Sequence, residues 1–218
     1  MLQRALQLPW LRNRLLDLRW SRVYRLHERW MDFYLGVETK KCEKPENFGI
    51  DPSECFAYVP ADWWGLSLQL RKIPIRAGEV FCELGCGKGR VLLWASRKAF
   101  GRIVGIELIP ELANQARKNL RSTEAEIITG DASKVAIPDD VTFFYAFQPF
   151  PLHIFLTVVE RMRAQALKSN TPVRFLYNSP VYHEYLEGTA GLTDLSHLYL
   201  TERAQNEFRF YEISPHVE

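Results

Sequence analysis

Two hydrophobic patterns alternate along the chain from residue 79 onward. Short apolar runs predict buried strands, and segments whose apolar residues recur every three or four positions predict helices that cover them. In chain order the pattern predicts strands at 79–84, 102–107, 126–129, 141–147 and 173–178, with helices at 90–100, 110–120 and 152–166. Such alternation is typical of a mostly parallel sheet with helices on both faces.

The end of the chain breaks this alternation. Residues 195–201 and 207–213 both resemble strands, and only residues 202–206 lie between them. So short a connection leaves no room for a crossover helix, and the two segments must therefore pair antiparallel. The fold class expected is α/β, with a mostly parallel seven-stranded sheet that finishes in an antiparallel C-terminal hairpin.

Before residue 79 the pattern predicts helices without strands. Apolar residues recur at helical spacing in two groups over residues 5–35, which indicates one or two amphipathic helices. The groups are Leu8, Leu11, Leu15 and Leu18, and Val23, Leu26, Trp30 and Phe33. Residues 36–60 lack this spacing and predict an irregular connector, followed by a short helix near 62–72 with Asp62 as its N-cap. We therefore expect a helical extension with its connector at 1–60 and the main domain at 61–218.

The formal net charge of +2 is unevenly distributed. Residues 1–34 contain seven Arg against three acidic residues, so this segment carries +4 and the remainder −2. The seven are Arg4, Arg12, Arg14, Arg19, Arg22, Arg25 and Arg29. Three interpretations stay open: Arg side chains solvated around a packed helix, contacts to nucleic-acid phosphates with Trp stacked on bases, or peripheral attachment to an anionic membrane.

Composition excludes several classes of protein. A hydrophobic share of 47% with 25% charged residues is that of a globular chain rather than a disordered one. No run of about 18 apolar residues occurs, so we expect no transmembrane segment, no secretory signal, and a cytoplasmic location. The cysteines lack the paired spacing of a metal site, so we expect reduced thiols and no metal. They are Cys42, Cys55, Cys82 and Cys86.

A glycine-rich loop carries the functional prediction. Gly85, Gly87 and Gly89 form a GxGxG pattern directly after a predicted buried strand and at the start of a predicted helix. Glycine tolerates positive φ in such a turn, and the absence of Cβ lets a ligand approach the backbone near the helix N-terminus. Glu107 ends the next strand, where it can accept hydrogen bonds from both hydroxyls of a ribose. A dinucleotide-binding dehydrogenase would prefer glycine where Arg90 stands.

The segment 83–90 resembles motif I of the class I S-adenosylmethionine-dependent methyltransferases. Residues 106–108 and 130–132 resemble two later motifs of that family, and the C-terminal hairpin resembles its antiparallel last strand. The resemblance implies a Rossmann-like fold and S-adenosyl-L-methionine as the cofactor. It further implies the following cofactor contacts: Glu83, Gly85, Cys86, Gly87 and Gly89 at the methionine end, Glu107 and Leu108 at the ribose, and Asp131 with Ala132 at the adenine. Tyr58, together with Trp63 and Trp64, forms either a lid across the cofactor or a staple for the N-terminal extension.

A narrower likeness concerns the acceptor side. Residues 33–39, 58–60 and 143–151 are similar to a group of small, functionally uncharacterised bacterial methyltransferases, and more loosely to seven-strand protein-lysine methyltransferases. The small bacterial proteins usually carry Asn-Pro-Phe after the fourth strand, where this chain has Gln148. We expect Gln148 to orient the acceptor, Tyr145 to exclude water beside it, and the nearby His153 to be a candidate base. The alternatives are a structural cap for Gln148 and a surface role for His153.

Methyl transfer is an in-line displacement that needs alignment in a dry site rather than a covalent residue. No acidic residue or histidine stands plainly at the end of the fourth predicted strand, which favours an amine on a small molecule or protein over a hydroxyl acceptor. Two alternatives are a protein that binds or modifies RNA through its Arg- and Trp-rich N-terminus, and a cofactor-binding relative without catalysis.

Overall fold

The structure, a computed structural model, describes residues 23–51, 53–205 and 207–216. These residues fall into two compact units, one ending at Lys40 and one beginning at Lys41. The boundary that we expected at residue 60, between the helical extension and the main domain, stays a prediction. The first unit contains a helix over residues 23–35, and the Leu8–Leu18 group lies outside the described residues. Asp32 accepts hydrogen bonds from the Thr39 amide at 3.0 Å and hydroxyl at 2.9 Å, which closes the turn after this helix.

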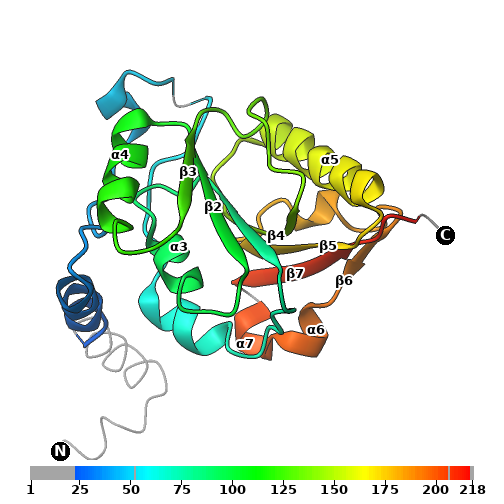
Figure 1. Ribbon diagram of the computed structural model, residues 1–218, viewed down its shortest axis with the longest axis horizontal. Helices are drawn as coiled ribbons and strands as arrows, with labels where there is room; N and C mark the ends of the chain where they lie inside the picture. Colours follow the sequence, from blue (N-terminus) through cyan, green and yellow to red (C-terminus); the bar gives the residue numbers. More distant parts are fainter. Residues whose placement is uncertain (1–22, 52, 206, 217–218) are drawn as a thin grey trace, which may run out of the picture. The chain divides into compact units, whose positions relative to one another are not determined.

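The second unit is built on a seven-stranded sheet in the order β3-β2-β1-β4-β5-β7-β6 (Figure 1). The strands are β1 (Val80–Leu84), β2 (Arg102–Glu107), β3 (Glu126–Thr129), β4 (Val141–Phe147), β5 (Val173–Asn178), β6 (Leu192–Asp194) and β7 (Phe208–Ile213). β1 to β5 pair in parallel, and β7 runs antiparallel to both β5 and β6. The predicted fold class is therefore confirmed. The strand order reverses between β1 and β4, and ligands of open α/β sheets bind at such a switch point.

Three longer helices flank the sheet. They are α3 (Arg90–Ala95), α4 (Pro110–Asn119) and α5 (Leu152–Ser169). In Figure 1, α3 and α4 lie on one side of the sheet and the yellow helix α5 on the other. The short elements are the 3-10 helices η1 (Pro45–Phe48) and η3 (His183–Tyr185), the π-helical turn η2 (Gly65–Gln69), α6 (Ser196–Tyr199) and α7 (Glu202–Gln205). No helix among the described residues is long and apolar enough to cross a membrane.

The central strands are buried on both faces, as parallel strands between helices must be. All five residues of β1 are buried. Alternate residues of β1 and β4 pack against Phe155 and Met162 of α5 in the larger core cluster. On the opposite face the rings of Phe81, Phe143 and Phe210 stack across three strands, with centroids 5.6 and 6.0 Å apart. This double burial holds the carboxyl ends of the strands rigid.

Three of the predicted elements differ from the structure. The helix expected at 90–100 is shorter and ends at Ala95. The segment 195–201 is not a strand, because the Asp194 carboxylate accepts a hydrogen bond from the Ser196 amide at 2.7 Å and starts α6 there. The strand that pairs with β7 is the shorter β6 just before it. The helix expected at 62–72 shrinks to a turn around η2, although Asp62 does accept the Gly65 amide as its predicted cap.

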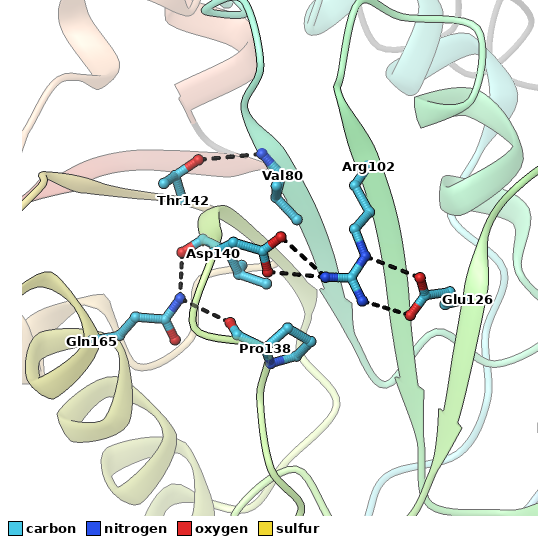
Figure 2. A network of polar contacts seen from close by, with 8 residues as sticks. Val80, Arg102, Glu126, Pro138, Asp140, Thr142 and Gln165 are labelled. Carbon is cyan, nitrogen blue, oxygen red and sulfur yellow. Dashed lines mark hydrogen bonds and ion pairs between the residues drawn. The ribbon is translucent and has the colours of Figure 1, made fainter. Parts of the chain in front are cut away.

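A polar network joins the amino ends of three strands (Figure 2). Arg102 of β2 donates to Glu126 of β3 at 2.6 Å and to both oxygens of Asp140 at 3.0 Å. Gln165 of α5 donates to the Val141 carbonyl at the start of β4. These contacts fix the amino ends of the strands. Ligands collect at the opposite, carboxyl ends.

A buried ion pair supports the same end of the sheet. Arg174 of β5 is 1% exposed and pairs with Glu79, which is 6% exposed. The guanidinium also donates to the Pro74 carbonyl at 2.7 Å and lies 4.9 Å from the centre of the Phe143 ring. Removing one member of such a pair leaves an uncompensated charge in the core.

We expect Arg174→Met to lower the free energy of unfolding by about 3–5 kcal/mol, because Glu79 would stay buried without its cation. Arg76→Met is the matched control, since Arg76 pairs with Glu212 while its own side chain is 53% exposed. That exposed pair is worth at most about 1 kcal/mol. Urea denaturation measures both values. A double variant, Glu79→Leu with Arg174→Met, should recover most of the loss, and equal effects of Arg174→Met and Arg76→Met would contradict the assignment.

Candidate active site

A cavity of about 710 Å³ opens at the carboxyl ends of β1, β2 and β4. Four continuous segments line it: residues 54–61, 106–109, 130–134 and 147–150. Parts of the glycine loop and the first turns of α5 complete the wall. The cavity thus lies at the switch point of the sheet, where the sequence predicted a ligand.

The glycine loop needs its glycines for two separate reasons. Gly85 and Gly87 have φ of +72° and +52°, a region that other residues rarely adopt. In addition, a Cβ on Gly85 would lie 2.5 Å from Pro149, and a Cβ on Gly87 would lie 2.2 Å from the Tyr58 ring. The sequence attributed the missing side chains to a ligand, whereas the structure shows two protein segments pressed against the loop.

Glu83, next to the last residue of β1, faces the cavity as a buried carboxyl group. It is 4% exposed, and its Oε2 atom has no hydrogen-bond partner among the described residues. Burial, with a contribution from the charge of Glu107, raises the pKa of Glu83 well above its ordinary value. A buried carboxylate without a partner is costly unless a cation or hydrogen-bond donor meets it. Glu83 is therefore suited to hold the ammonium group of an amino-acid moiety.

Glu107, at the end of β2, is fixed by the backbone on both of its oxygens. Oε2 accepts from the Gly87 amide at 2.7 Å and Oε1 from the Ile109 amide at 2.9 Å. Burial raises the pKa of Glu107, and these amides oppose the shift. A hydrogen bond from the Leu108 amide acts in the same direction. These backbone donors fix the orientation of the carboxylate, and its remaining lone pairs can accept from hydroxyl groups such as those of a ribose.

Asp131 and Ala132 lie in the turn after β3 and line the cavity. Asp131 Oδ1 accepts from the Ser133 amide at 2.8 Å and from its hydroxyl at 2.7 Å, and Oδ2 pairs with Lys134 at 2.8 Å. Burial alone would raise the pKa of Asp131, but hydrogen bonds from Lys134 and Ser133 outweigh it and lower the pKa. Asp131 therefore caps its own turn and forms part of the cavity wall.

The side of the cavity where we expected the acceptor contains two of the three predicted catalytic residues. Gln148 and His153 line it, and His153 is exposed on the first turn of α5. Gln148 has a φ of +36°, and its Oε1 accepts a hydrogen bond from the Tyr177 hydroxyl. Burial raises the pKa of Tyr177, which keeps that hydroxyl protonated, and a hydrogen bond from the Tyr182 backbone acts in the opposite direction. Gln148 is thus held by β5 rather than left free at the rim.

Tyr145 is not part of the cavity lining. Its side chain has no exposed area, and its hydroxyl accepts a hydrogen bond from Asn178 at 2.8 Å. Burial and the nearby Glu83 raise the pKa of Tyr145 well above its ordinary value. At the end of β4, Phe147 lines the cavity and Tyr145 does not, so the structure does not bring Tyr145 together with Gln148 and His153.

The sequence analysis missed Arg90, which lines the cavity with only 3% of its surface exposed. Its Nη1 donates to the Ala61 carbonyl at 2.9 Å, and its guanidinium lies 5.0 Å from the centre of the Trp63 ring. A cation here can hold a carboxylate at the same end of the cavity as Glu83. The available signal was a charged residue that begins an otherwise apolar helix.

The segment 41–61, here called the strap, is also more than the irregular connector expected. Glu43 and Tyr58 pair through two backbone hydrogen bonds of 3.1 and 2.8 Å. Lys88 of the glycine loop reaches the strap, with its Nζ 3.4 Å from the Lys41 carbonyl and 3.5 Å from a Glu43 oxygen. Of the three aromatic residues considered for a lid, only Tyr58 lines the cavity. Trp63 and Trp64 lie outside the lining.

The four cysteines are free thiols, and three of them are buried. Cys86 lines the cavity, where burial raises its pKa well above the ordinary value, so it is no thiolate nucleophile. In the part of the chain that the structure describes, no group of three or more His, Cys, Asp or Glu side chains could hold a metal ion.

Residues 81–172 match the sequence model of a family described as a methyltransferase domain. The ribosomal protein L11 methyltransferase of Burkholderia mallei is 25% identical over 91 residues, a match that covers 42% of this chain and 28% of that protein. The chain thus spans just over a quarter of the length of the curated relatives it matches.

Solved structures share the fold. A dimethyladenosine transferase from Plasmodium falciparum superposes with a TM-score of 0.51 at 13% identity, over 73% of this chain and 64% of that one. An RNA methyltransferase from Salinibacter ruber in complex with S-adenosyl-L-homocysteine has a TM-score of 0.48 at 21% identity, over 73% and 97%. The family match covers the glycine loop, Glu83 and Glu107, whose arrangement fits the ammonium and ribose groups of the family's cofactor. Residues 81–172 therefore belong to a methyltransferase domain of the class I, S-adenosylmethionine-dependent kind.

Proposed function

We propose that this protein transfers the methyl group of S-adenosylmethionine to a nitrogen acceptor, an amine on a small molecule or on a protein. One observation carries the proposal: the carboxyl group of Glu83, whose Oε2 atom has no hydrogen-bond partner among the described residues, and the amide of Gln148 line the same cavity. One side of that cavity offers the buried carboxylates that a cationic cofactor needs. The other side offers a neutral amide between aromatic rings, where an acceptor can be oriented.

Four groups would hold the cofactor in this arrangement. Glu83 would accept the methionine ammonium group and Arg90 would pair with its carboxylate. Glu107 would accept the ribose hydroxyls, and the turn that contains Asp131 and Ala132 would receive the adenine. Arg90 is a buried cation, and Glu83 would be a buried anion once it loses its proton, so the amino-acid end can be bound as a zwitterion with each charge compensated.

The acceptor side would work by orientation and exclusion of water. Gln148 would direct the nitrogen lone pair along the line of the carbon–sulfur bond that breaks, and Phe147 and Phe150 would keep water from the reacting atoms. S-adenosylmethionine held by Glu83, Arg90 and Glu107 would supply the methyl group and a sulfur that takes the bonding electron pair, and the acceptor nitrogen would pass its proton to solvent. An apolar pocket favours the neutral, nucleophilic form of an amine. His153 is the available base if the proton must be removed inside the cavity.

A second candidate function rests on the excess of Arg over residues 1–34. Contacts of these residues with nucleic-acid phosphates would favour an RNA acceptor, and contacts with anionic lipids would attach the enzyme to a membrane surface. The Burkholderia mallei relative is named for a protein acceptor, which supports the amine on a protein instead. Salt-dependent RNA binding would support the RNA acceptor, lipid co-sedimentation would support the membrane surface, and the absence of both would leave the amine acceptor. The location that we propose is the cytoplasm.

We expect S-adenosylmethionine and S-adenosylhomocysteine to raise the melting temperature of the protein, because a ligand that binds only the folded state stabilises it. At a hundred times its Kd, each should add about 2.7 kcal/mol. Differential scanning fluorimetry measures the shift, with NAD as the control that should give none. Radiolabelled cofactor incubated with fractionated lysate then identifies the acceptor. Equal stabilisation by NAD would contradict the proposal, and binding without transfer to any fraction would favour the non-catalytic alternative.

Glu83→Gln should weaken S-adenosylhomocysteine binding by about ten-fold or more, because it removes the charge opposite the ammonium group while keeping the volume. Since burial raises the pKa of Glu83, the carboxyl group must lose a proton to form that pair. The affinity of the wild type should therefore rise with pH above the range in which an ordinary carboxyl group titrates, and that of Glu83→Gln should not.

Calorimetric titrations in two buffers of different ionisation enthalpy detect the released proton directly. Glu111→Gln, an exposed change on α4, is the matched control and should behave as the wild type. Unchanged affinity and unchanged proton release in Glu83→Gln would show that the ammonium group binds elsewhere.

Gln148→Ala should lower turnover with the identified acceptor by about ten-fold, the effect of losing one modest hydrogen bond. The affinity for S-adenosylhomocysteine should change little. Gln148→Gly is a useful second variant, because it removes the same side chain while relieving the positive φ. If both variants keep full turnover, Gln148 only caps the strand, and the likeness to the Asn-Pro-Phe segment has no catalytic meaning.

A further inference from the structure

The turn after β3 is held from behind by a residue outside the cavity. Arg161 of α5 donates from Nη1 to the Ala132 carbonyl at 2.6 Å and from Nη2 to the Val135 carbonyl. Ala132 is 4% exposed and lines the cavity, while Arg161 does not. The guanidinium therefore fixes the side of the turn that faces away from the ligand.

The turn itself leaves few alternatives for its backbone. The Lys134 and Val135 amides both donate to the Asp131 carbonyl, at 2.9 and 2.8 Å. Gly130 has a φ of +150°, and a Cβ on it would lie 2.5 Å from a methyl group of Val135. These contacts close the turn locally, but they do not connect it to the rest of the domain. Among the hydrogen bonds described, the two from Arg161 attach it to a helix.

The helix that supplies Arg161 also forms the acceptor side of the cavity. His153, Ile154 and Thr157 of α5 line the cavity in its first turns. Arg161 follows Thr157 by four residues and so lies on a neighbouring part of the same helix face. The helix begins directly after the segment that contains Gln148. One rigid element thus contacts both the acceptor loop and the turn after β3.

We infer that Arg161 is a positioning residue, which holds the 130–135 turn at the distance from α5 that adenosine binding requires. The inference rests on the proposed function in one respect, namely that this turn receives the adenine. Arg161 touches no ligand in this arrangement. It acts through the carbonyl groups of Ala132 and Val135, whose turn presents Asp131 and the Ala132 backbone to the cavity.

The experiment compares Arg161→Gln and Arg161→Lys with a matched control on the same helix. Arg163→Gln is that control, because Arg163 pairs with the exposed Glu160 and lies outside the cavity lining. Calorimetry gives the Kd for S-adenosylhomocysteine and for adenosine alone, used as a probe without a methionine end. We expect Arg161→Gln to weaken both by about ten-fold and by the same factor, Arg161→Lys by less, and Arg163→Gln by less than about two-fold.

Hydrogen exchange supplies a readout that a general loss of stability would not reproduce. The Lys134 and Val135 amides should exchange faster in Arg161→Gln, while amides of β1 and β4 keep their protection and the melting temperature stays near that of the wild type. With the identified acceptor, KM for S-adenosylmethionine should rise and kcat at saturation should stay constant. Arg161→Lys, which keeps the charge, serves if Arg161→Gln does not fold.

The outcomes separate this inference from the proposed function. If the wild type binds S-adenosylhomocysteine and the Arg161→Gln variant binds it equally well, the positioning role alone is overturned. The same holds if adenosine binding is unchanged while S-adenosylhomocysteine binding falls. A wild type that binds neither compound would overturn the proposed function itself.

Discussion

The site depends on the absence of side chains in one loop, because three parts of the protein meet there at van der Waals distance. A Cβ on Gly85 would strike Pro149, one on Gly87 would strike the Tyr58 ring, and one on Gly89 would lie 2.8 Å from Leu120. The loop is thereby the point at which the acceptor side, the strap and α4 are brought together. Its glycines determine the shape of the cavity as well as the approach of a ligand, so a substitution there would displace protein segments on both sides of the reacting atoms.

The cavity contains two buried carboxyl groups that lower the stability of the site. Glu83 and Glu107 are both buried in one cavity, and burial raises the pKa of each. Glu107 recovers part of the cost through two backbone amides, whereas Glu83 has an oxygen without a partner in the described structure. The protein therefore keeps an unfavourable group in the cavity wall, which is a common compromise between stability and function. Under the proposed function, binding of the ammonium group would remove that cost and couple affinity to pH.

The sequence predicted the elements whose signal is local. β2 to β5 agree with the predicted strands residue by residue. Of the predicted cofactor residues, Gly85 and Glu107 line the cavity, whereas Gly87 and Gly89 do not, and the cofactor contacts stay a prediction. The β6–α6 region was wrong because a single Asx cap at Asp194 outweighs the strand-like pattern after it. The contacts of Arg90 and Arg161 could not be predicted for a different reason: Arg90 donates to a backbone carbonyl 29 residues away in the chain, and Arg161 to carbonyls 29 and 26 residues away. Contacts of that kind have no periodicity or spacing, so the sequence alone does not indicate the partners of these residues.

Gln148 shows how the acceptor side differs from that of the bacterial proteins to which the segment is similar. A non-glycine residue at positive φ costs about 1–2 kcal/mol, and asparagine tolerates this conformation better than glutamine does. The longer side chain places its oxygen on the Tyr177 hydroxyl, which an asparagine at the same backbone position would be one methylene short of reaching. The Tyr182 backbone donates to the oxygen of that hydroxyl, so the phenolic proton is directed toward Gln148. The amide is thereby oriented with its NH2 group away from Tyr177. The hydrogen bond to Tyr177 of β5 thus holds the glutamine side chain in place, although its positive φ is less favourable than it would be for asparagine.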